Sequence, residues 1–446
     1  MKKDWLLLIG SVAITLGIAL GIIRWFAPDL LGISPDLQLV KIDKKVPPFF
    51  ENIFRAEDSK SQTYLIKDPI TRVRAMPLYP DVGGLGPNDL LGFRNRAIPH
   101  SAKIVTLGDS QTYGNNAVIE RNWPGFMRAE LKPEGATVYN ISVGGWAAPQ
   151  YLNMLGKALA FGPEVIIVAF YTGNDPLESF MLVYGNPYWQ ALIPDKTLTA
   201  GDAPKSTFPA PKEEHWPVVF KDGVKTVFTP TLRLVSNLEH PAVQAGYNIM
   251  AEVARLIAES AADLEVKLLF TIIPTKELVY AKKVLAEGLQ VPQDYQTLIV
   301  REAANIEQLA RQIQSYPQVE YVDVLQPLQQ QAMQATGLYP EDDNGHPVAP
   351  GYDVIGRILA GAVKPRLSMP RQELVTLEVA PGQYNYMLLK DNGVYIFESP
   401  DFIESNGWPP GRVKTVTQDA ISGLPLRGVI NEVNPALYGP LGDKKQ

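Results

Sequence analysis

The chain reads KIVTLGDSQTYG over residues 103–114, and this stretch decides the fold. KIVTL at 103–107 is a short, β-branched apolar run of the kind that forms a buried strand. GDSQTYG at 108–114 then places Asp, Ser, Gln and Thr between two glycines, although any ordinary turn would reverse the chain. The glycines let the backbone bend sharply and predict that Ser110 lies at the tip of a strand-to-helix turn. A serine held in this way is a candidate nucleophile.

The composition is that of a large, ordered protein. The 446 residues are 46% hydrophobic and 20% charged, which is enough for a large core and more than one folding unit. The formal net charge is -6, and no stripe of Lys and Arg is interleaved with aromatic residues, so nucleic acid is not an expected partner. The sequence has no cysteine, which excludes a catalytic thiol and Cys-ligated zinc. We expect no metal and no cofactor.

The N-terminal segment has the pattern of a membrane anchor. Residues 5–23 carry no charge, and a helix of that length covers roughly 28 Å at ~1.5 Å per residue, close to the hydrocarbon thickness of a bilayer. Lys2 and Lys3 predict a cytoplasmic tip at 1–4, followed by an uncleaved transmembrane helix at 5–26 in contact with lipid. The rest of the chain would then lie outside the cytoplasm, in the periplasm or at the cell surface. A cleaved signal peptide and a buried helix of a soluble domain are the alternatives.

The remainder of the chain divides by texture. Residues 27–98 are irregular and rich in proline, which predicts a stalk that then packs along a domain. From 99 to 366, short apolar runs alternate with helical patterns. An insertion at 176–239, rich in Pro, Tyr, Trp and Lys, breaks that rhythm and is either a cover over the crevice or a long loop without a role. Residues 367–446 return to short strands between Gly-containing turns, which predicts a small β-rich extension.

Alternating strands and helices predict an α/β fold with a five-stranded parallel sheet covered by helices on both faces. Helical patterns lie at 123–131, 149–161 and 240–264. In such a sheet the active crevice lies beyond the carboxyl ends of the strands. The strand candidates are residues 103–107, 137–141, 164–171, 267–273 and 319–324.

A nucleophilic Ser110 needs a base, which can be sought among only 4 histidines. His346 lies in DDNGHPVAPGYDVIGRIL, a polar turn before an amphipathic helix. Asp343 precedes His346 in the same turn, so one local turn can hold ring and carboxylate in contact. A His-Pro turn that merely begins a helix is the alternative. The other histidines, which lie at the wrong end of the first strand or lack a neighbouring acceptor motif, are His100, His215 and His240.

Acyl transfer also needs donors for the oxyanion that forms on the substrate. NISVGGWAAPQ at 140–150 follows the second strand and offers the backbone N–H of Gly145. YTGNDP at 171–176 follows the third strand and offers the side-chain amide of Asn174. Each stretch alone is also a plausible turn. Their order, each at the end of a strand, favours a shared site.

These blocks together resemble the SGNH, or GDSL-type, hydrolase family. The matching blocks are GDSQTYG, the Gly of SVGG, the GND of YTGNDP and DNGH, and the resemblance covers about residues 99–366. It implies a three-layer, flavodoxin-like fold. It also implies Ser110 as the nucleophile, His346 as the base and Asp343 as the residue that orients the base. The implied oxyanion hole consists of the N–H of Ser110 together with Gly145 and Asn174.

Two further phrases extend the resemblance. GFRN at 92–95 and IPTKELVYA at 273–281 resemble membrane-anchored relatives associated with cell-surface polysaccharides, some of which are acetyltransferases of the alginate type. The alginate type places its Asp and His before the nucleophile. Here Asp343 and His346 follow Ser110, which favours the esterase-like arrangement and leaves transfer open.

The leading hypothesis is an extracytoplasmic serine esterase that works through an acyl-serine intermediate. Its expected substrate is an acetyl or other small acyl ester of a cell-surface polysaccharide, with partners in a polysaccharide assembly system. The alternatives are a polysaccharide O-acetyltransferase with the same triad and a non-catalytic glycan-binding module. Candidate substrate contacts are Asp109, Asp175 and Trp146, and candidate sugar platforms are Trp146, Tyr171, Trp189 and Trp216.

Overall fold

The computed structural model covers the region of the predicted catalytic domain and part of the C-terminal extension. The expected anchor at 5–26 lies outside the described residues, as does the expected stalk up to residue 63. No helix in the part of the chain that the structure describes is long and apolar enough to cross a membrane. The described residues are 64–82, 84–206, 208–264, 266–367, 373–380, 382–390, 393–399, 414–421 and 426–430.

A five-stranded parallel sheet forms the centre of the larger unit, as the sequence predicts. Its order is β4-β3-β5-β8-β9, and every neighbouring pair is parallel. Numbered along the sheet's own strands this is 2-1-3-4-5, the flavodoxin-like order, in which the crevice opens where the chain switches sides of the first strand. That point is the carboxyl end of β3 and β5. The strands are β3 (Ile104–Gly108), β4 (Val138–Ser142), β5 (Val165–Tyr171), β8 (Lys267–Ile273) and β9 (Val319–Tyr321).

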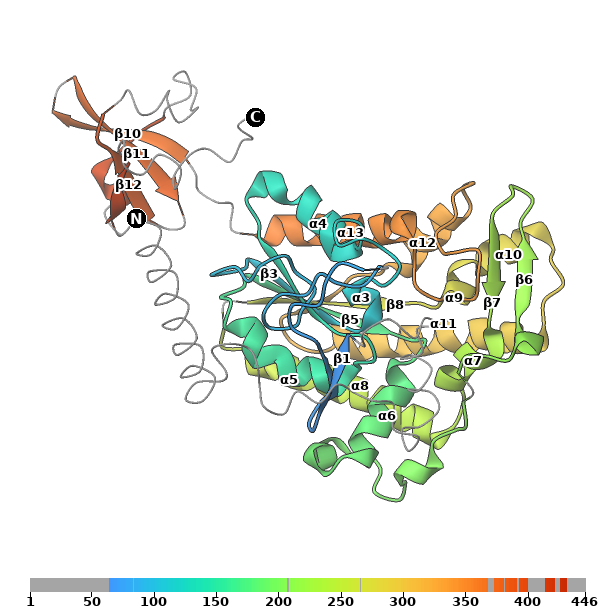
Figure 1. Ribbon diagram of the computed structural model, residues 1–446. Helices are drawn as coiled ribbons and strands as arrows, with labels where there is room; N and C mark the ends of the chain where they lie inside the picture. The colour runs from blue at the N-terminus through green and yellow to red at the C-terminus, as the bar shows by residue number, and fades with distance from the viewer. Residues whose placement is uncertain are drawn as a thin grey trace, which may run out of the picture. The chain divides into compact units, whose positions relative to one another are not determined.

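Helices cover both faces of this sheet, which is why β3, β4 and β5 are buried at every position and read as unbroken apolar runs. Figure 1 shows α4, α12 and α13 on one face and α5, α8 and α11 on the other. The three predicted helices are confirmed as α4, α5 and α8. The bounds are α4 (Trp123–Glu130), α5 (Ala148–Leu159), α8 (Pro241–Ala261), α11 (Gln293–Gln314), α12 (Leu325–Ala332) and α13 (Ala349–Val363).

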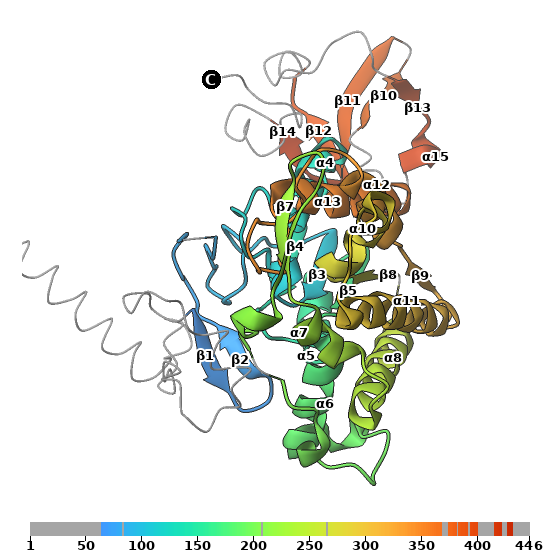
Figure 2. The ribbon, with the colours of Figure 1, turned by 90° about the vertical axis from the view of Figure 1, so that its right-hand side faces the viewer.

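The hydrophobic core begins well before residue 99, where the sequence placed the start of the domain. A hairpin of β1 (Leu65–Asp68) and β2 (Arg72–Ala75) packs beside the start of α5 (Figure 2). There the indole N–H of Trp146 donates to the carbonyl of Val73 at 2.7 Å. The described end of the expected stalk is therefore part of the domain. Its residues in the main core include Tyr64, Leu65, Val73, Ala75, Tyr79 and Phe93.

The insertion at 176–239 is more regular than its sequence predicts. Its first part continues α6 (Asp175–Gly185), which is buried on most sides, so its apolar residues show no amphipathic period. Its second part contains a hairpin and a short helix, and Val227 of the hairpin donates its N–H to Asp342 O at 3.3 Å. The hairpin consists of β6 (Trp216–Val219) and β7 (Lys225–Phe228), and the short helix is α7 (Pro230–Leu234). After the insertion, the larger unit also contains α9 (Lys276–Val279) and α10 (Ala281–Glu287).

The chain divides into two compact units. The described residues within 1–130 and 137–365 form the larger one, and those within 131–136 and 366–446 form the smaller. The smaller unit contains a five-stranded sheet in the order β13-β10-β11-β12-β14, with a core that includes Val375 and Met387. The short strands expected after residue 367 are thus present. They are β10 (Glu373–Ala380), β11 (Gln383–Lys390), β12 (Gly393–Phe397), β13 (Lys414–Val416) and β14 (Leu426–Ile430).

Candidate active site

The nucleophile loop, residues 108–114, turns the chain from β3 directly into the short helix α3 (Ser110–Tyr113). The side chain of Asp109 accepts a hydrogen bond from Gln111 N at 2.9 Å and so caps the helix. Gly114 ends it in the left-handed region, at φ +86°. A Cβ at Gly108 would collide with the side chain of Thr112. Gly108 and Gly114 therefore allow the tight turn between β3 and α3 that the sequence predicts.

The nucleophile loop brings its serine to the predicted histidine. The distance between Ser110 Oγ and His346 Nε2 is 2.8 Å. The second acceptor near the hydroxyl is Asp109 Oδ2, which is further away at 3.3 Å. A proton can thus pass from Ser110 to His346 without movement of either side chain.

The orienting residue predicted from the sequence is not the one that contacts the ring. In the histidine loop, residues 342–346, the Oδ1 atom of Asn344 lies 2.8 Å from His346 Nδ1 and also accepts from the His346 backbone N–H at 3.0 Å. Asp343 points elsewhere: its Oδ2 lies 3.6 Å from Nε2 of His215, and its side chain is 42% exposed. Asn344 takes the place of Asp343 because a side chain two residues before His346 can accept from its backbone N–H and from its ring at once.

The environment of the histidine keeps the ring neutral. Burial, with the positive charges of Arg233 and Lys276, lowers the pKa of His346 to about 3. With Asn344 Oδ1 as acceptor, Nδ1 carries the ring proton and Nε2 is left free to take the proton of Ser110. An amide oxygen in this place fixes the tautomer of the base, as the Asn of a Cys-His-Asn triad does.

The predicted oxyanion donors lie at the ends of the strands on either side of β3. Gly145 follows β4 at φ +78°, a conformation that glycine adopts without strain. Its neighbour Gly144 lies against the nucleophile, because a Cβ there would be 3.7 Å from Ser110 Cβ. Asn174 follows β5 as the residue before α6 and makes no side-chain cap there. Its side chain interacts instead with Glu178 of α6 and opposes the rise that burial causes in the pKa of that carboxyl.

The three predicted substrate contacts are buried, which corrects their assignment. Asp109 and Asp175 are both 0% exposed, and Trp146 is 1% exposed. Burial raises the pKa of Asp109 to about 7, and burial with the nearby charge of Asp109 raises the pKa of Asp175 well above its usual value. Tyr151 donates its hydroxyl proton to Asp175 Oδ2 at 3.0 Å. These three side chains belong to the interior beside the site and present no surface to a sugar.

Sequence reasoning missed the buried residue that holds the nucleophile loop. Arg94 is 0% exposed, and its hydrogen bonds within the described residues go to backbone carbonyls, including Gly114 O at 2.5 Å. Its guanidinium also donates to the carbonyls of Gly86, Tyr113 and Ala117. The signal was the GFRN phrase at 92–95, in which a charge follows an aromatic residue.

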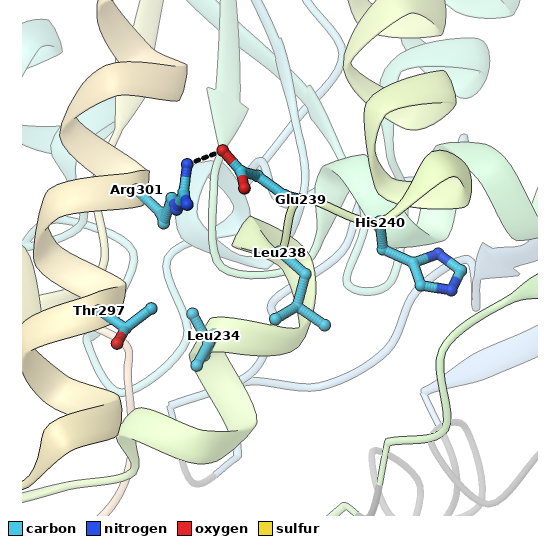
Figure 3. A pocket seen from close by; sticks show the side chains of 6 residues that line it. All are labelled: Leu234, Leu238, Glu239, His240, Thr297 and Arg301. Carbon is cyan, nitrogen blue, oxygen red and sulfur yellow. Dashed lines mark hydrogen bonds and ion pairs between the residues drawn. The ribbon is translucent and has the colours of Figure 1, made fainter.

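The pocket drawn in Figure 3 lies apart from this site, and the described residues offer no metal cluster. In the part of the chain that the structure describes, no group of three or more His, Asp or Glu side chains is placed to hold a metal ion. A pocket of about 320 Å³ lies at the start of α8 (Figure 3), where Glu239 pairs with Arg301, and it contains neither Ser110 nor His346. We assign it no part in the chemistry. Its lining residues are Leu234, Leu238, Glu239, His240, Thr297 and Arg301.

Solved structures match this chain only at low sequence identity and low TM-score. An extracellular lipase from Streptomyces rimosus is 13% identical, and the alignment covers 59% of this chain and 100% of the lipase with a TM-score of 0.35. A lipolytic protein of the G-D-S-L family from Desulfitobacterium hafniense is 14% identical, over 58% of this chain and 99% of that one, with a TM-score of 0.32. No curated protein matches the chain in sequence.

The family comparison is more decisive. The sequence model of the GDSL-like lipase/acylhydrolase family matches residues 106–354, which is more than half of the chain. The matched range begins inside β3 and ends inside α13, so it contains both Ser110 and His346. The chain therefore belongs to the GDSL-like lipase/acylhydrolase family and is a hydrolase of the SGNH type.

Proposed function

We propose that the protein is an extracytoplasmic serine esterase that removes acetyl or another small acyl group from a cell-surface polysaccharide. The observation that carries the proposal is the 2.8 Å contact between Ser110 Oγ and His346 Nε2. A hydroxyl held against a neutral imidazole is what nucleophilic acyl transfer requires. Glycan binding alone does not need this pair, which argues against a non-catalytic binding module.

Acylation would use the residues of both loops. Ser110 Oγ attacks the ester carbonyl carbon while His346 Nε2 takes the hydroxyl proton. The carbonyl oxygen becomes an oxyanion and accepts from the N–H groups of Ser110 and Gly145 and from the amide of Asn174. As the bond to the sugar oxygen breaks, His346 returns the proton to that oxygen. The products are an acyl-serine and a free sugar hydroxyl.

Deacylation repeats these steps with water as the nucleophile. His346 takes a proton from the water, whose oxygen attacks the carbonyl carbon of the acyl-serine. The bond between that carbon and Ser110 Oγ breaks, and the proton passes to Oγ. The carboxylic acid leaves and the enzyme is restored. A transferase would differ only in using a sugar hydroxyl in place of water.

Two sequence features support the substrate class and the location. The uncharged run at 5–23 supports a site outside the cytoplasm. The GFRN and IPTKELVYA phrases, at 92–95 and 273–281, support a role in polysaccharide modification through their resemblance to anchored relatives. A reporter fused after Gln446 should accordingly be active outside the cytoplasm. Activity of the reporter in the cytoplasm would overturn the proposed location.

The deciding experiment supplies the full chain, purified in detergent, with an acetylated chromogenic ester and a panel of oligosaccharides. Products are separated by mass. We expect free acetate as the main product, and only a modest rise in turnover when glycan is added. Capture of most of the acetyl label by oligosaccharide, with acetate near background, would replace the esterase by an O-acetyltransferase. Glycan binding without any acyl-serine would replace it by a binding module.

A further inference from the structure

A buried lysine contacts the histidine loop at two points. Lys276 begins α9, directly after β8, and is 0% exposed. Its Nζ donates to the carbonyl oxygen of Asp342 at 2.9 Å and to that of Asn344 at 3.1 Å. These two carbonyls bracket Asp343, and the second belongs to the residue whose side chain orients His346.

The lysine is held by carbonyls and not by an acid. Among the described residues, Nζ of Lys276 has no ion pair within 4.0 Å. The charged groups that face it are Glu277 on its own helix, Arg233 on α7, and Asp342 and Asp343 on the histidine loop. Burial lowers the pKa of Lys276 to about 8, so the ammonium form still prevails at neutral pH. Such a desolvated charge is costly unless its hydrogen bonds are made.

We propose that Lys276 is a positioning residue, which clamps the histidine loop so that Asn344 and His346 are aligned with Ser110. The inference rests on the proposed role of His346 as the base. The clamp acts on the backbone on both sides of Asp343, where the loop has no helix or strand to stiffen it. The positive charge of Lys276 also disfavours protonation of the nearby His346 ring.

A second buried lysine provides a matched control. Lys283 on α10 is 3% exposed, and its Nζ contacts Asp222 Oδ2 at 2.5 Å and Gln334 O at 3.4 Å. It is as buried as Lys276 but does not touch the histidine loop. Loss of Lys283 therefore reproduces the cost of removing a buried, hydrogen-bonded ammonium without disturbing the base.

The test compares Lys276→Met, Lys276→Arg and Lys283→Met in the full chain. For Lys276→Met we expect kcat on the acetyl ester to fall about 10²-fold, as for a misplacement of about 1 Å, with KM changed less than about 2-fold. Lys276→Arg, which keeps charge and donors, should recover part of kcat. Lys283→Met should lower the thermal midpoint yet leave kcat near that of the wild type.

The titration of the His346 ring, followed by NMR, is the readout that a merely structural role would not move. Removing the positive charge in Lys276→Met should raise the pKa of His346, whereas Lys283→Met should leave it unchanged. If Lys276→Met leaves both the titration and kcat as in the control, the inference is overturned. If the wild type turns over no ester, the proposed function fails instead, and the titration alone decides whether Lys276 acts on His346.

Discussion

The two loops that meet at the catalytic pair are held in opposite ways. The nucleophile loop, residues 108–114, is fixed by its own capping hydrogen bonds, by the strand that leads into it and by Arg94, which precedes that strand in the chain. The histidine loop, residues 342–346, contains no helix or strand. Residues distant in sequence hold it by hydrogen bonds to its carbonyls or side chains. They include Gln111, Asn116, Val227 and Lys276.

Because their supports differ, the two loops should respond differently to substitution. The nucleophile loop depends on β3, on its own turn and on the donors of Arg94, so its supports lie close to it in the sequence. The position of the histidine loop depends on α9 and on the β6–β7 hairpin of the insertion. We therefore expect substitutions in the first loop to remove reacting atoms, and substitutions around the second to misalign atoms that remain present.

The largest effect should come from removing either member of the reacting pair. Ser110→Ala and His346→Ala are each expected to lower kcat/KM about 10³-fold or more, because no other side chain supplies the attacking oxygen or the base. The thermal midpoint should change little, since each truncation deletes few buried atoms. Initial rates with the acetyl ester and thermal unfolding measure the two quantities. Retention of more than about a tenth of the rate by Ser110→Ala would show that another group attacks.

The next effect tests the clamp on the nucleophile loop. Arg94→Met should lower the free energy of unfolding by about 3 kcal/mol or more, because it leaves several buried carbonyls without donors. Arg96→Met is the matched control: Arg96 is 62% exposed and pairs with Glu120 at the surface, so its loss should cost less than about 1 kcal/mol. Chemical denaturation measures both. Equal costs would show that the carbonyl contacts of Arg94 contribute little.

A smaller effect distinguishes the two candidate orienters of the histidine. Asn344→Ala removes the acceptor at Nδ1 and should lower kcat about 10- to 100-fold, while Asp343→Ala should change it less than about 5-fold. Steady-state kinetics on both variants decide the matter. A larger loss for Asp343→Ala would mean that its carboxylate reaches His346 during turnover, as the sequence alone suggested.

The pH dependence of activity follows from the neutral histidine. Because the pKa of His346 is lowered to about 3, the base is unprotonated throughout the range from pH 5 to 7. We expect kcat/KM to be nearly flat across that range, with the acid limb below it. An acid limb near pH 6.5, the usual value for histidine, would show that burial and the neighbouring cations do not depress the pKa.

The smallest effect concerns stability against pH. Burial raises the pKa of Asp109 to about 7, of Glu302 to about 7 and of Glu178 to about 8. The folded state thus keeps protons that the unfolded chain loses near pH 4, so these groups make stability fall as the pH rises from about 4 through the folded values. Their contribution should lower the thermal midpoint across that range and level off above about pH 8. Glu178→Gln should flatten that decline, and an unchanged slope would contradict the assignment.

Much of the fold and the reacting pair could be predicted from the sequence. The five strands appeared as short apolar runs because a sheet covered on both faces buries most of its strand positions. Ser110 stood out through its glycines, and His346 was found by elimination among few histidines. In both cases the signal lay within a few residues of the functional atom.

The rest depends on contacts that a linear pattern does not contain. Asp343 and Asn344 are both polar acceptors in one turn, and only the backbone direction decides which faces His346. Arg94 is satisfied by carbonyls that lie both before and after it in the chain, so no acidic partner marks it. Helix α6 is buried on most sides and shows no amphipathic period. Each of these depends on how the chain folds back on itself.

The hairpin of β1 and β2 also limits how the gene of such a protein can be recombined during evolution. The family match begins at residue 106, yet the core already includes Tyr64 and Leu65, and Arg94 lies between the two boundaries. A gene fragment that starts at the family boundary would carry every reacting group and lack part of its own scaffold. Recombination between positions 64 and 106 would therefore tend to yield inactive proteins. Substitutions in this stretch would be restricted as in a buried core, and not tolerated as in a linker.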